Sequence, residues 1–126
     1  MDLDGFKSIN DKYGHEIGDL LLLLTSKRLQ SCFRENDFIA RLGGDEFTAT
    51  IIHKPKDKIA TALSQRIEQE FKQPFLIKNQ EIQCTISVGM ANYPINAQSV
   101  EDLLKLADKI MYKNKKKKYA TLKQSS

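Results

Sequence analysis

The stretch Gly43-Gly44-Asp45-Glu46-Phe47 decides the fold of this chain, because it places a tight turn between two apolar runs. The runs cover residues 38–42 and 47–52, and they predict the paired strands of a hairpin. Glycine lacks a Cβ and tolerates positive φ, so the backbone can turn sharply and approach a ligand closely. The carboxylates of Asp45 and Glu46 at the tip can hold a hard cation such as Mg²⁺. For so short a motif the commoner interpretation is blander, a hairpin whose acidic residues are only solvated.

The composition indicates one soluble domain with a real core. The chain has 126 residues, of which 40% are hydrophobic and 29% charged. Its net charge of +4 is concentrated in five lysines within residues 113–118. We therefore do not expect a protein that binds nucleic acid over its whole surface. The lysine-rich end could still bind phosphate groups.

The cysteines and the apolar runs bear on the compartment. Cys32 and Cys84 are far apart and in no metal-ligand spacing, so they are expected to be free thiols in a reducing environment. The apolar run 20–24 is far too short to span a bilayer, and Met1 opens no signal peptide. The expected location is cytoplasmic, as free protein or as the cytoplasmic part of a membrane-anchored one.

Hydrophobic periodicity predicts the other elements. Asp19 is expected to be the N-cap of a leucine-rich, deeply buried helix. The elements suggest an α/β sandwich, with a mainly antiparallel sheet flanked by helices. Helices are predicted over residues 9–13, 20–33, 56–72 and 100–117, and strands over 75–77, 82–93 and 120–122.

Several motifs in a fixed order make the chain resemble the GGDEF family, the diguanylate cyclase domain. The resemblance runs from Asp2 to about Lys115 and is far more specific than the pentapeptide alone. The matching segments are residues 2–7, 9–11, 13–15, 18–19, 34–37, 41–47, 85–89 and 107–108, with Tyr112 and Lys115.

The resemblance implies a fold like the catalytic domain of nucleotide cyclases and a reaction that joins two GTP molecules into cyclic diguanylate, releasing pyrophosphate. Each protomer of a homodimer would hold one GTP, and each 3′-hydroxyl would attack the α-phosphate of the other. Such phosphoryl transfer depends on positioning and charge neutralisation, which Mg²⁺ or Mn²⁺ would assist.

The family's metal and catalytic residues carry over onto the start of the chain and the turn of the predicted hairpin. Asp2 and the Leu3 carbonyl match metal ligands, Asp45 matches the bridging carboxylate, and Glu46 would assist the metal or the deprotonation of the attacking hydroxyl. Without the motif, Asp2 would be only an exposed terminal residue. Asp4 is expected to be a turn residue.

The substrate residues also carry over by position. Asn10 and Asp19 match the pair that recognises guanine, because a carboxylate accepts from N1–H and the exocyclic amine. For Asp19 the N-cap role is the bland alternative, and both roles could hold together. Residues expected to contact the rest of the nucleotide are Gly5, Phe6, Lys7, Gly43, Gly44 and Lys115.

Arg34 and Asp37 match the family's inhibitory site, where the product cyclic diguanylate restrains the enzyme; the bland alternative is a surface ion pair.

Two departures from the family stand out. The family's first strand and helix have no counterpart ahead of Met1, which suggests a fragment of a longer protein. Lys118 and Tyr119 stand where the family usually has Gly followed by Arg or Lys.

Two rival functions remain open. The first is a non-catalytic module that binds GTP or cyclic diguanylate inside a larger signalling protein, beside sensor or phosphodiesterase domains. The second is a basic interaction surface on the lysine-rich last helix for nucleic acid or an anionic membrane. The lack of interleaved aromatic residues on that helix argues against nucleic-acid binding.

Overall fold

A computed structural model describes residues 1–54 and 58–124 of the chain. The chain divides into two compact units, the larger formed by Leu3–Ile86 and the smaller by Met1–Asp2 together with Ser87–Ser126. Each unit is described by itself. In the described ranges, no helix is both long and apolar enough to cross a membrane.

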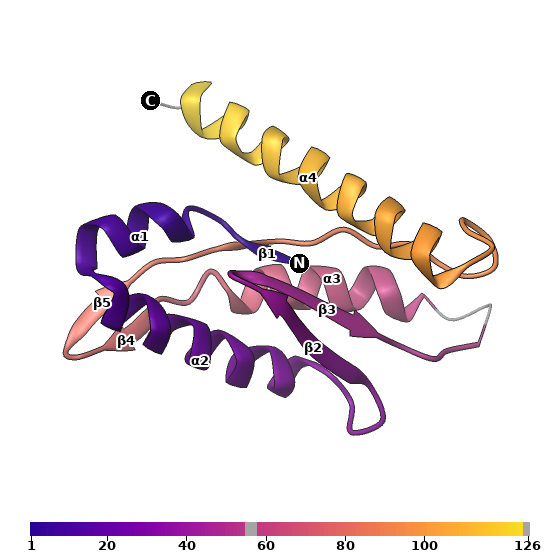
Figure 1. The fold of residues 1–126 in the computed structure, drawn as a ribbon, viewed down its shortest axis with the longest axis horizontal. Coiled ribbons are helices and arrows are strands. Elements are labelled where there is room, and N and C mark those ends of the chain that lie inside the picture. The colour runs from indigo at the N-terminus through magenta and orange to yellow at the C-terminus, as the bar shows by residue number, and fades with distance from the viewer. Residues whose placement is uncertain (55–57, 125–126) are drawn as a thin grey trace. The chain divides into compact units, whose positions relative to one another are not determined.

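The described chain contains helices and two β-sheets, as the sequence predicts (Figure 1). One sheet has the strand order β2-β3-β1-β6, and the other is the small antiparallel pair β4-β5. The elements are β1 (Asp2–Leu3), α1 (Phe6–Tyr13), α2 (His15–Cys32), β2 (Phe38–Gly43), β3 (Glu46–Thr50), α3 (Ile59–Glu70), β4 (Phe75–Ile77), β5 (Gln80–Ile82), β6 (Ile86–Ser87) and α4 (Val100–Gln124).

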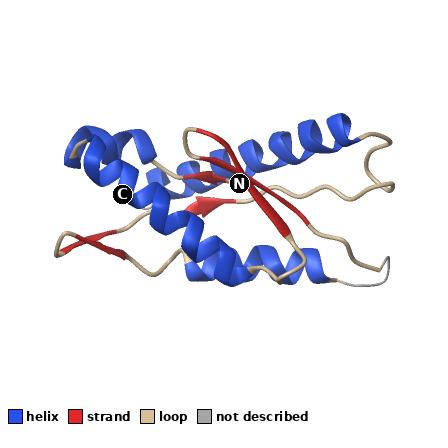
Figure 2. Cartoon of the chain, turned by 60° about the horizontal axis from the view of Figure 1, so that its bottom comes forward, coloured by secondary structure: helices blue, strands red, loops and turns tan. Residues whose placement is uncertain are grey.

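The predicted hairpin is confirmed, and it is the red ribbon of paired strands that Figure 2 displays. Phe38 of β2 pairs with Thr50 of β3, and the antiparallel register continues to Arg41 opposite Phe47. The register then shifts between Arg41 and Gly43, so Leu42 occupies a bulge just before the turn. Phe47 is buried and anchors the turn end of the hairpin in the core.

Helix α2 begins earlier than predicted. Gly14, with φ of 94°, is its N-cap, and the Gly18 amide donates to the Gly14 carbonyl at 3.1 Å. The expectation that Asp19 is the N-cap was therefore wrong, because Gly14 both ends α1 and starts α2. The leucine run is buried at Leu21 and Leu22 as expected, but Leu23 is 53% exposed.

The second half of the chain also departs from the predicted strands. The predicted strand 75–77 is confirmed as β4, whereas the predicted strand 82–93 is reduced to the short β5 and β6. The alternation that suggested it is real, since Ile82, Cys84 and Ile86 are all buried. Between those strands the Thr85 carbonyl accepts from the Asp4 amide at 2.9 Å, which draws the chain toward the turn that begins at Asp4.

Within the smaller unit, α4 runs past the residues that were predicted to form a strand at 120–122, so that prediction was wrong. No glycine or proline interrupts the sequence between Val100 and Gln124, and lysine, alanine and leucine favour helix. The helix is capped at its start, where the Ser99 hydroxyl accepts from the Asp102 amide at 3.1 Å. A Cβ on Gly89 would lie 2.2 Å from the Ala107 carbonyl oxygen, so this glycine lets the segment that follows β6 approach α4 closely.

Arg28 ties α2 to the segment that ends α3. Its guanidinium lies over the Phe75 ring at 3.6 Å from the centroid and over Phe71 at 5.3 Å. The same group donates to the backbone carbonyls of Gln73 at 2.8 Å and Glu70 at 3.2 Å. It therefore satisfies carbonyls that the end of α3 leaves without helical partners.

Replacing Arg28 with Lys should destabilise the larger unit, because an ammonium group cannot both stack on the rings and form this fork of hydrogen bonds. We expect a loss of about 1–3 kcal/mol in the free energy of unfolding. Urea unfolding followed by circular dichroism would measure it. Arg66→Lys is the matched control, since exposed Arg66 makes one long contact to the Ser31 carbonyl; equal losses in both variants would contradict the prediction.

Candidate functional site

The turn that carries the two carboxylates adopts a backbone that glycine favours. Gly43 has φ of 147° and Gly44 has φ of 54°, and a Cβ at either position would meet nothing within 4 Å. Backbone conformation, rather than lack of space, therefore selects glycine at both positions. The Arg41 side chain reaches back across the turn, and its Nε donates to the Gly44 carbonyl at 2.9 Å.

Two of the predicted metal ligands meet in the larger unit. The Leu3 amide donates to the Asp45 carbonyl at 3.3 Å, so residues 42 positions apart in the sequence become backbone neighbours. Asp4 lies next in the chain, and its carboxylate accepts from the Thr85 hydroxyl at 2.7 Å. That bond gives Asp4 the structural turn role predicted for it, while Glu46 is exposed beside the turn.

The third predicted metal ligand, Asp2, belongs to the smaller unit, as does Lys115, which was predicted to contact the substrate. Lys115 Nζ contacts Asp2 Oδ2 at 3.0 Å, and both side chains are largely buried. The second oxygen, Asp2 Oδ1, is buried and has no hydrogen-bond partner within the described ranges. A buried carboxylate oxygen of this kind fits a cation ligand, because such oxygens are costly to leave unpaired.

A metal site made only of side chains is not found in the part of the chain that the structure describes. No cluster there brings together three His, Cys, Asp or Glu side chains. The predicted ligand set differs from such a cluster, because it combines two carboxylates with the Leu3 carbonyl. The donors are all oxygens, the type that Mg²⁺ and Mn²⁺ prefer.

Asn10, one of the two predicted guanine residues, packs against Gly18 where α1 meets α2. A Cβ on Gly18 would lie 1.7 Å from Asn10 Oδ1, so the absence of a side chain at Gly18 makes room for the Asn10 amide. Asn10 Oδ1 is itself buried and unpartnered among the described residues, which leaves an acceptor for a ligand donor. Gly18 is thus a functional candidate that the sequence analysis quoted but gave no role.

Asp19 lies on the next position of α2 and lines a pocket of about 310 Å³. The pocket is open to solvent and has an apolar wall and a charged wall. Its lining residues are Asp19, Leu22, Leu23, Ser26 and Arg41. Arg41 is therefore shared between this pocket and the carboxylate turn, a link that the sequence pattern did not reveal.

The predicted phosphate segment is the start of α1. Gly5 adopts φ of 72° and is the N-cap, and its carbonyl accepts from the Ile9 amide at 3.1 Å. Phe6 and Lys7 form the first turn, whose amides have no intrahelical acceptor. Such amides, together with the helix dipole, favour an anion, and Lys7 is exposed beside them.

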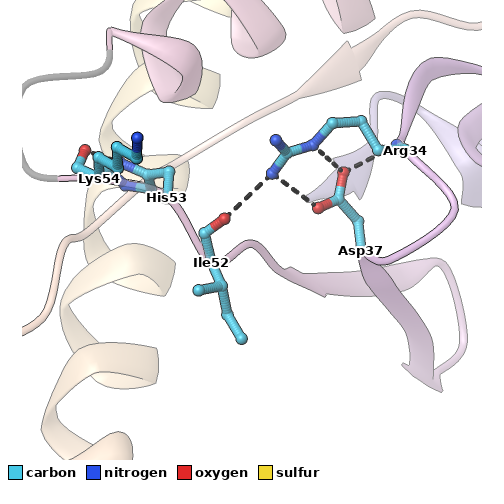
Figure 3. Close-up of polar contacts among 5 residues, drawn as sticks. All are labelled: Arg34, Asp37, Ile52, His53 and Lys54. Carbon is cyan, nitrogen blue, oxygen red and sulfur yellow. Dashed lines mark hydrogen bonds and ion pairs between the residues drawn. The ribbon is translucent and has the colours of Figure 1, made fainter.

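Arg34 and Asp37 form a compact pair in the larger unit (Figure 3). Arg34 Nη2 donates to Asp37 Oδ1 at 3.2 Å and to the Ile52 carbonyl at 3.1 Å, and the Arg34 amide donates to Asp37 Oδ2 at 2.8 Å. Burial opposes ionisation of the Asp37 carboxyl, but the hydrogen bonds and charge of Arg34 outweigh it and lower the Asp37 pKa. The Arg34 side chain stays 54% exposed, so a ligand can still reach it.

The free thiols predicted from the cysteine spacing are confirmed. Cys32 and Cys84 are both unbridged and buried in the larger unit. Burial raises the pKa of the Cys32 thiol, and the charge of neighbouring Arg66 opposes this rise only in part. A buried thiol with a raised pKa is a poor nucleophile, so Cys32 acts as a core residue.

Comparison with known proteins identifies the family. The family model for the diguanylate cyclase GGDEF domain matches residues 1–121 of this chain. The chain therefore belongs to the GGDEF family, and its α+β architecture is that of the solved GGDEF domains.

Three relatives illustrate the similarity. The bifunctional diguanylate cyclase/cyclic di-GMP phosphodiesterase MucR of Pseudomonas aeruginosa is 43% identical over 113 residues, which make up 89% of this chain and 16% of MucR. A structure of the YfiN GGDEF domain from Pseudomonas aeruginosa is 33% identical, with a TM-score of 0.88 over 92% of this chain and 68% of that one. The GGDEF domain of DgcB from Caulobacter crescentus, solved in complex with c-di-GMP, is 25% identical, with a TM-score of 0.77 over 91% of this chain and 68% of that one. The chain thus spans a small part of MucR, and about two thirds of the two solved domains.

Asp37→Asn should weaken the larger unit in a pH-dependent way. Because the folded-state pKa of Asp37 is depressed below its ordinary value of 3.8, the charge contributes stability above that pH and loses it as pH falls through the lower folded-state pKa. We expect the variant to lose about 1 kcal/mol of unfolding free energy at pH 7 and to approach the parent near pH 2. Urea unfolding at several pH values would measure this, with exposed Glu35→Gln as control; a pH-independent difference would contradict it.

Proposed function

We propose that this domain is a diguanylate cyclase, which condenses two GTP molecules into cyclic di-GMP with release of pyrophosphate. The observation that carries the proposal is the contact between Leu3 and Asp45, since it places two predicted metal ligands from distant parts of the sequence side by side. Membership of the GGDEF family and the similarity to MucR support the same reaction.

Asp45 and the Leu3 carbonyl would hold a divalent cation, with Asp2 as the neighbouring carboxylate in the chain. Mg²⁺ or Mn²⁺ bound there would neutralise phosphate charge during displacement of pyrophosphate. Exposed Glu46 would accept the proton of the attacking 3′-hydroxyl, directly or through water. The bond that forms joins that oxygen to the α-phosphorus, and the bond that breaks releases pyrophosphate.

Asn10 and Asp19 would select guanine. The buried Asn10 oxygen needs a donor, and the exposed Asp19 carboxylate faces a pocket with apolar leucine walls that suit a flat base. Guanine offers donors at N1 and at the exocyclic amine, whereas adenine presents an acceptor at N1. The pair therefore supports GTP rather than ATP as the substrate.

The triphosphate would lie against the start of α1. The amides of Phe6 and Lys7 and the side chain of Lys7 supply the donors, and Gly5 lets the chain enter the helix without a side chain in the way. Gly43 and Gly44 would let the backbone approach the nucleotide, and Lys115 would add charge from α4. GTP, the substrate, is cytoplasmic, and we place the domain in that compartment.

The reaction requires two nucleotides in opposed positions, so the active form is proposed to be a homodimer. The product could then return to the pair formed by Arg34 and Asp37. A cyclic dinucleotide offers phosphates and guanine edges that an arginine fork binds well. Two observations support this inhibitory role: the pair occupies the sequence position of the family's inhibitory site, and the Arg34 side chain is exposed.

A second candidate function is a nucleotide-binding module without turnover. The observation that favours it is the Lys115–Asp2 contact, which pairs a predicted phosphate lysine with a predicted metal ligand. Such a module would bind GTP or cyclic di-GMP and report to attached sensor or phosphodiesterase domains. Binding with no product would distinguish this function from the cyclase.

Incubation of concentrated protein with GTP and Mg²⁺, followed by chromatography, tests the proposal. We expect cyclic di-GMP from the parent protein and a loss of at least about 100-fold in Asp45→Ala, because a metal ligand is removed. Asp11→Ala, which changes an exposed acid of α1, is the control and should keep its activity. Folded parent protein that binds GTP but yields no product would overturn the cyclase in favour of the module.

Gly18→Ala should reduce guanine selectivity while the domain stays folded. The new methyl group would occupy the space of the Asn10 oxygen and turn that flexible amide away from the base. We expect GTP binding to weaken about tenfold, as for Asn10→Ala, with little further loss in the double variant because both changes remove one hydrogen-bonding group. Calorimetric titration would measure this, and additive losses in the double variant would contradict it.

A further inference from the structure

Arg41 takes part in two features of the larger unit, the Gly43–Gly44 turn and the pocket that Asp19 lines. Its Nε donates to the Gly44 carbonyl at 2.9 Å, and Arg41 is one of the residues that line the pocket of Asp19. The same residue therefore contacts the turn that precedes Asp45 and borders the proposed guanine pocket. The sequence analysis gave this residue no role.

The two glycines of the turn contribute no side-chain packing, since added Cβ atoms would meet nothing within 4 Å. The register shifts at Leu42 just before the turn, and Leu42 itself is 63% exposed. The Arg41 bond to the Gly44 carbonyl is a side-chain restraint across this turn.

The rest of the Arg41 fork faces no protein acceptor. Among the described residues, neither terminal nitrogen of its guanidinium has a hydrogen-bond or ion-pair partner, and Asp19 in the same pocket does not pair with it. Arginine presents its donors in one rigid plane, so a group that binds the terminal nitrogens also fixes the direction of Nε. A ligand that binds the terminal nitrogens of Arg41 would therefore also restrain the turn through the bond that Nε makes to Gly44.

We propose that Arg41 is a positioning residue through which a nucleotide in the Asp19 pocket fixes the Gly43–Gly44 turn, so that base binding orders the carboxylates that follow. The inference rests on the proposed function. Its ligand chemistry is an acceptor oxygen or nitrogen of the nucleotide, either on guanine or on a phosphate. Either acceptor would bind the free end of the guanidinium fork.

This role differs from a purely structural one. A residue that only stabilises the turn would restrain it equally with and without nucleotide. A residue that couples the two places transmits the presence of the nucleotide to the turn, and its removal abolishes the transmission while binding beside Asp19 persists. Coupling of this kind would also limit productive metal binding to complexes that already hold the correct base.

Hydrogen exchange with GTP in excess EDTA tests the coupling, because no metal can then order Asp45 directly. In the parent protein, GTP should slow exchange about fivefold or more in peptides covering both the helix around Asp19 and the turn 43–47. In Arg41→Met, which keeps the stem and loses the donors, GTP should slow exchange around Asp19 only. Arg41→Lys, which keeps the charge without the fork, should show the same loss in the turn.

Leu42→Ala is the matched control, since it changes the neighbouring exposed side chain and should retain protection of the turn. A parallel exchange experiment with guanosine in place of GTP identifies which group of the nucleotide binds Arg41. Protection of the turn by guanosine indicates the base, and protection by GTP alone indicates a phosphate. Both results support the proposal.

The failures are distinguishable. Protection of the turn that persists in Arg41→Met, or that is lost equally in Leu42→Ala, overturns the coupling and leaves the proposed cyclase intact. The same holds if GTP protects the helix but never the turn of the parent protein. A parent protein in which GTP protects neither segment overturns the proposed nucleotide site and this inference with it.

Discussion

The conformation of the Gly43–Gly44 turn is the constraint on which the rest of the site depends. Both residues take positive φ angles, which side chains larger than hydrogen disfavour, and the turn reverses the chain between β2 and β3. The reversal sets where Asp45 and Glu46 stand relative to the strand that follows. Phe47 then fixes that strand in the core, so the acidic tip projects from a rigid base.

A second set of bonds joins this hairpin to the start of the chain. The Leu3 amide reaches the Asp45 carbonyl, and Asp4 is held from the other side by both the amide–carbonyl bond and the hydroxyl bond to Thr85. Leu3 is completely buried, so this segment cannot shift without disturbing the core. The backbones of Leu3 and Asp45 are therefore held by the same packing that stabilises the sheet.

The sequence was informative where a local signal and the fold agree. The hairpin was predictable because the Gly-Gly turn and the apolar runs around it point to the same structure, and β4 was predictable from Pro74 and the short run after it. The start of α2 was missed because Asp19 has the side chain of an N-cap, whereas Gly14 caps the helix through its backbone. A strand was expected over the three residues 120–122. These residues instead continue helix α4, which decides their conformation.

The residues of the candidate site differ in the same way, since some could be proposed from the sequence and others could not. Residues with a motif position, such as Asn10 and Asp45, could be proposed from sequence, and the family to which those motifs pointed is shown by the match to residues 1–121. Gly18 and Arg41 could not be assigned roles, since the first matters for the space it leaves to Asn10 and the second for a bond to a backbone carbonyl. Neither property has a signature in a single sequence, because both depend on how separate elements pack.

The Lys115–Asp2 contact is where the two candidate functions meet, and charge decides how much weight it carries. A divalent cation has twice the charge of a lysine ammonium and binds carboxylates directly, so a cation held by Asp2 would compete with Lys115 for that carboxylate. The unpartnered Asp2 Oδ1 offers a second oxygen to that cation. A displaced Lys115 ammonium would be drawn to a triphosphate, which carries several negative charges and accepts charge-assisted hydrogen bonds. The contact as it stands favours the nucleotide-binding module, whereas a metal held at Asp2 would leave Lys115 available to the phosphates of the proposed cyclase.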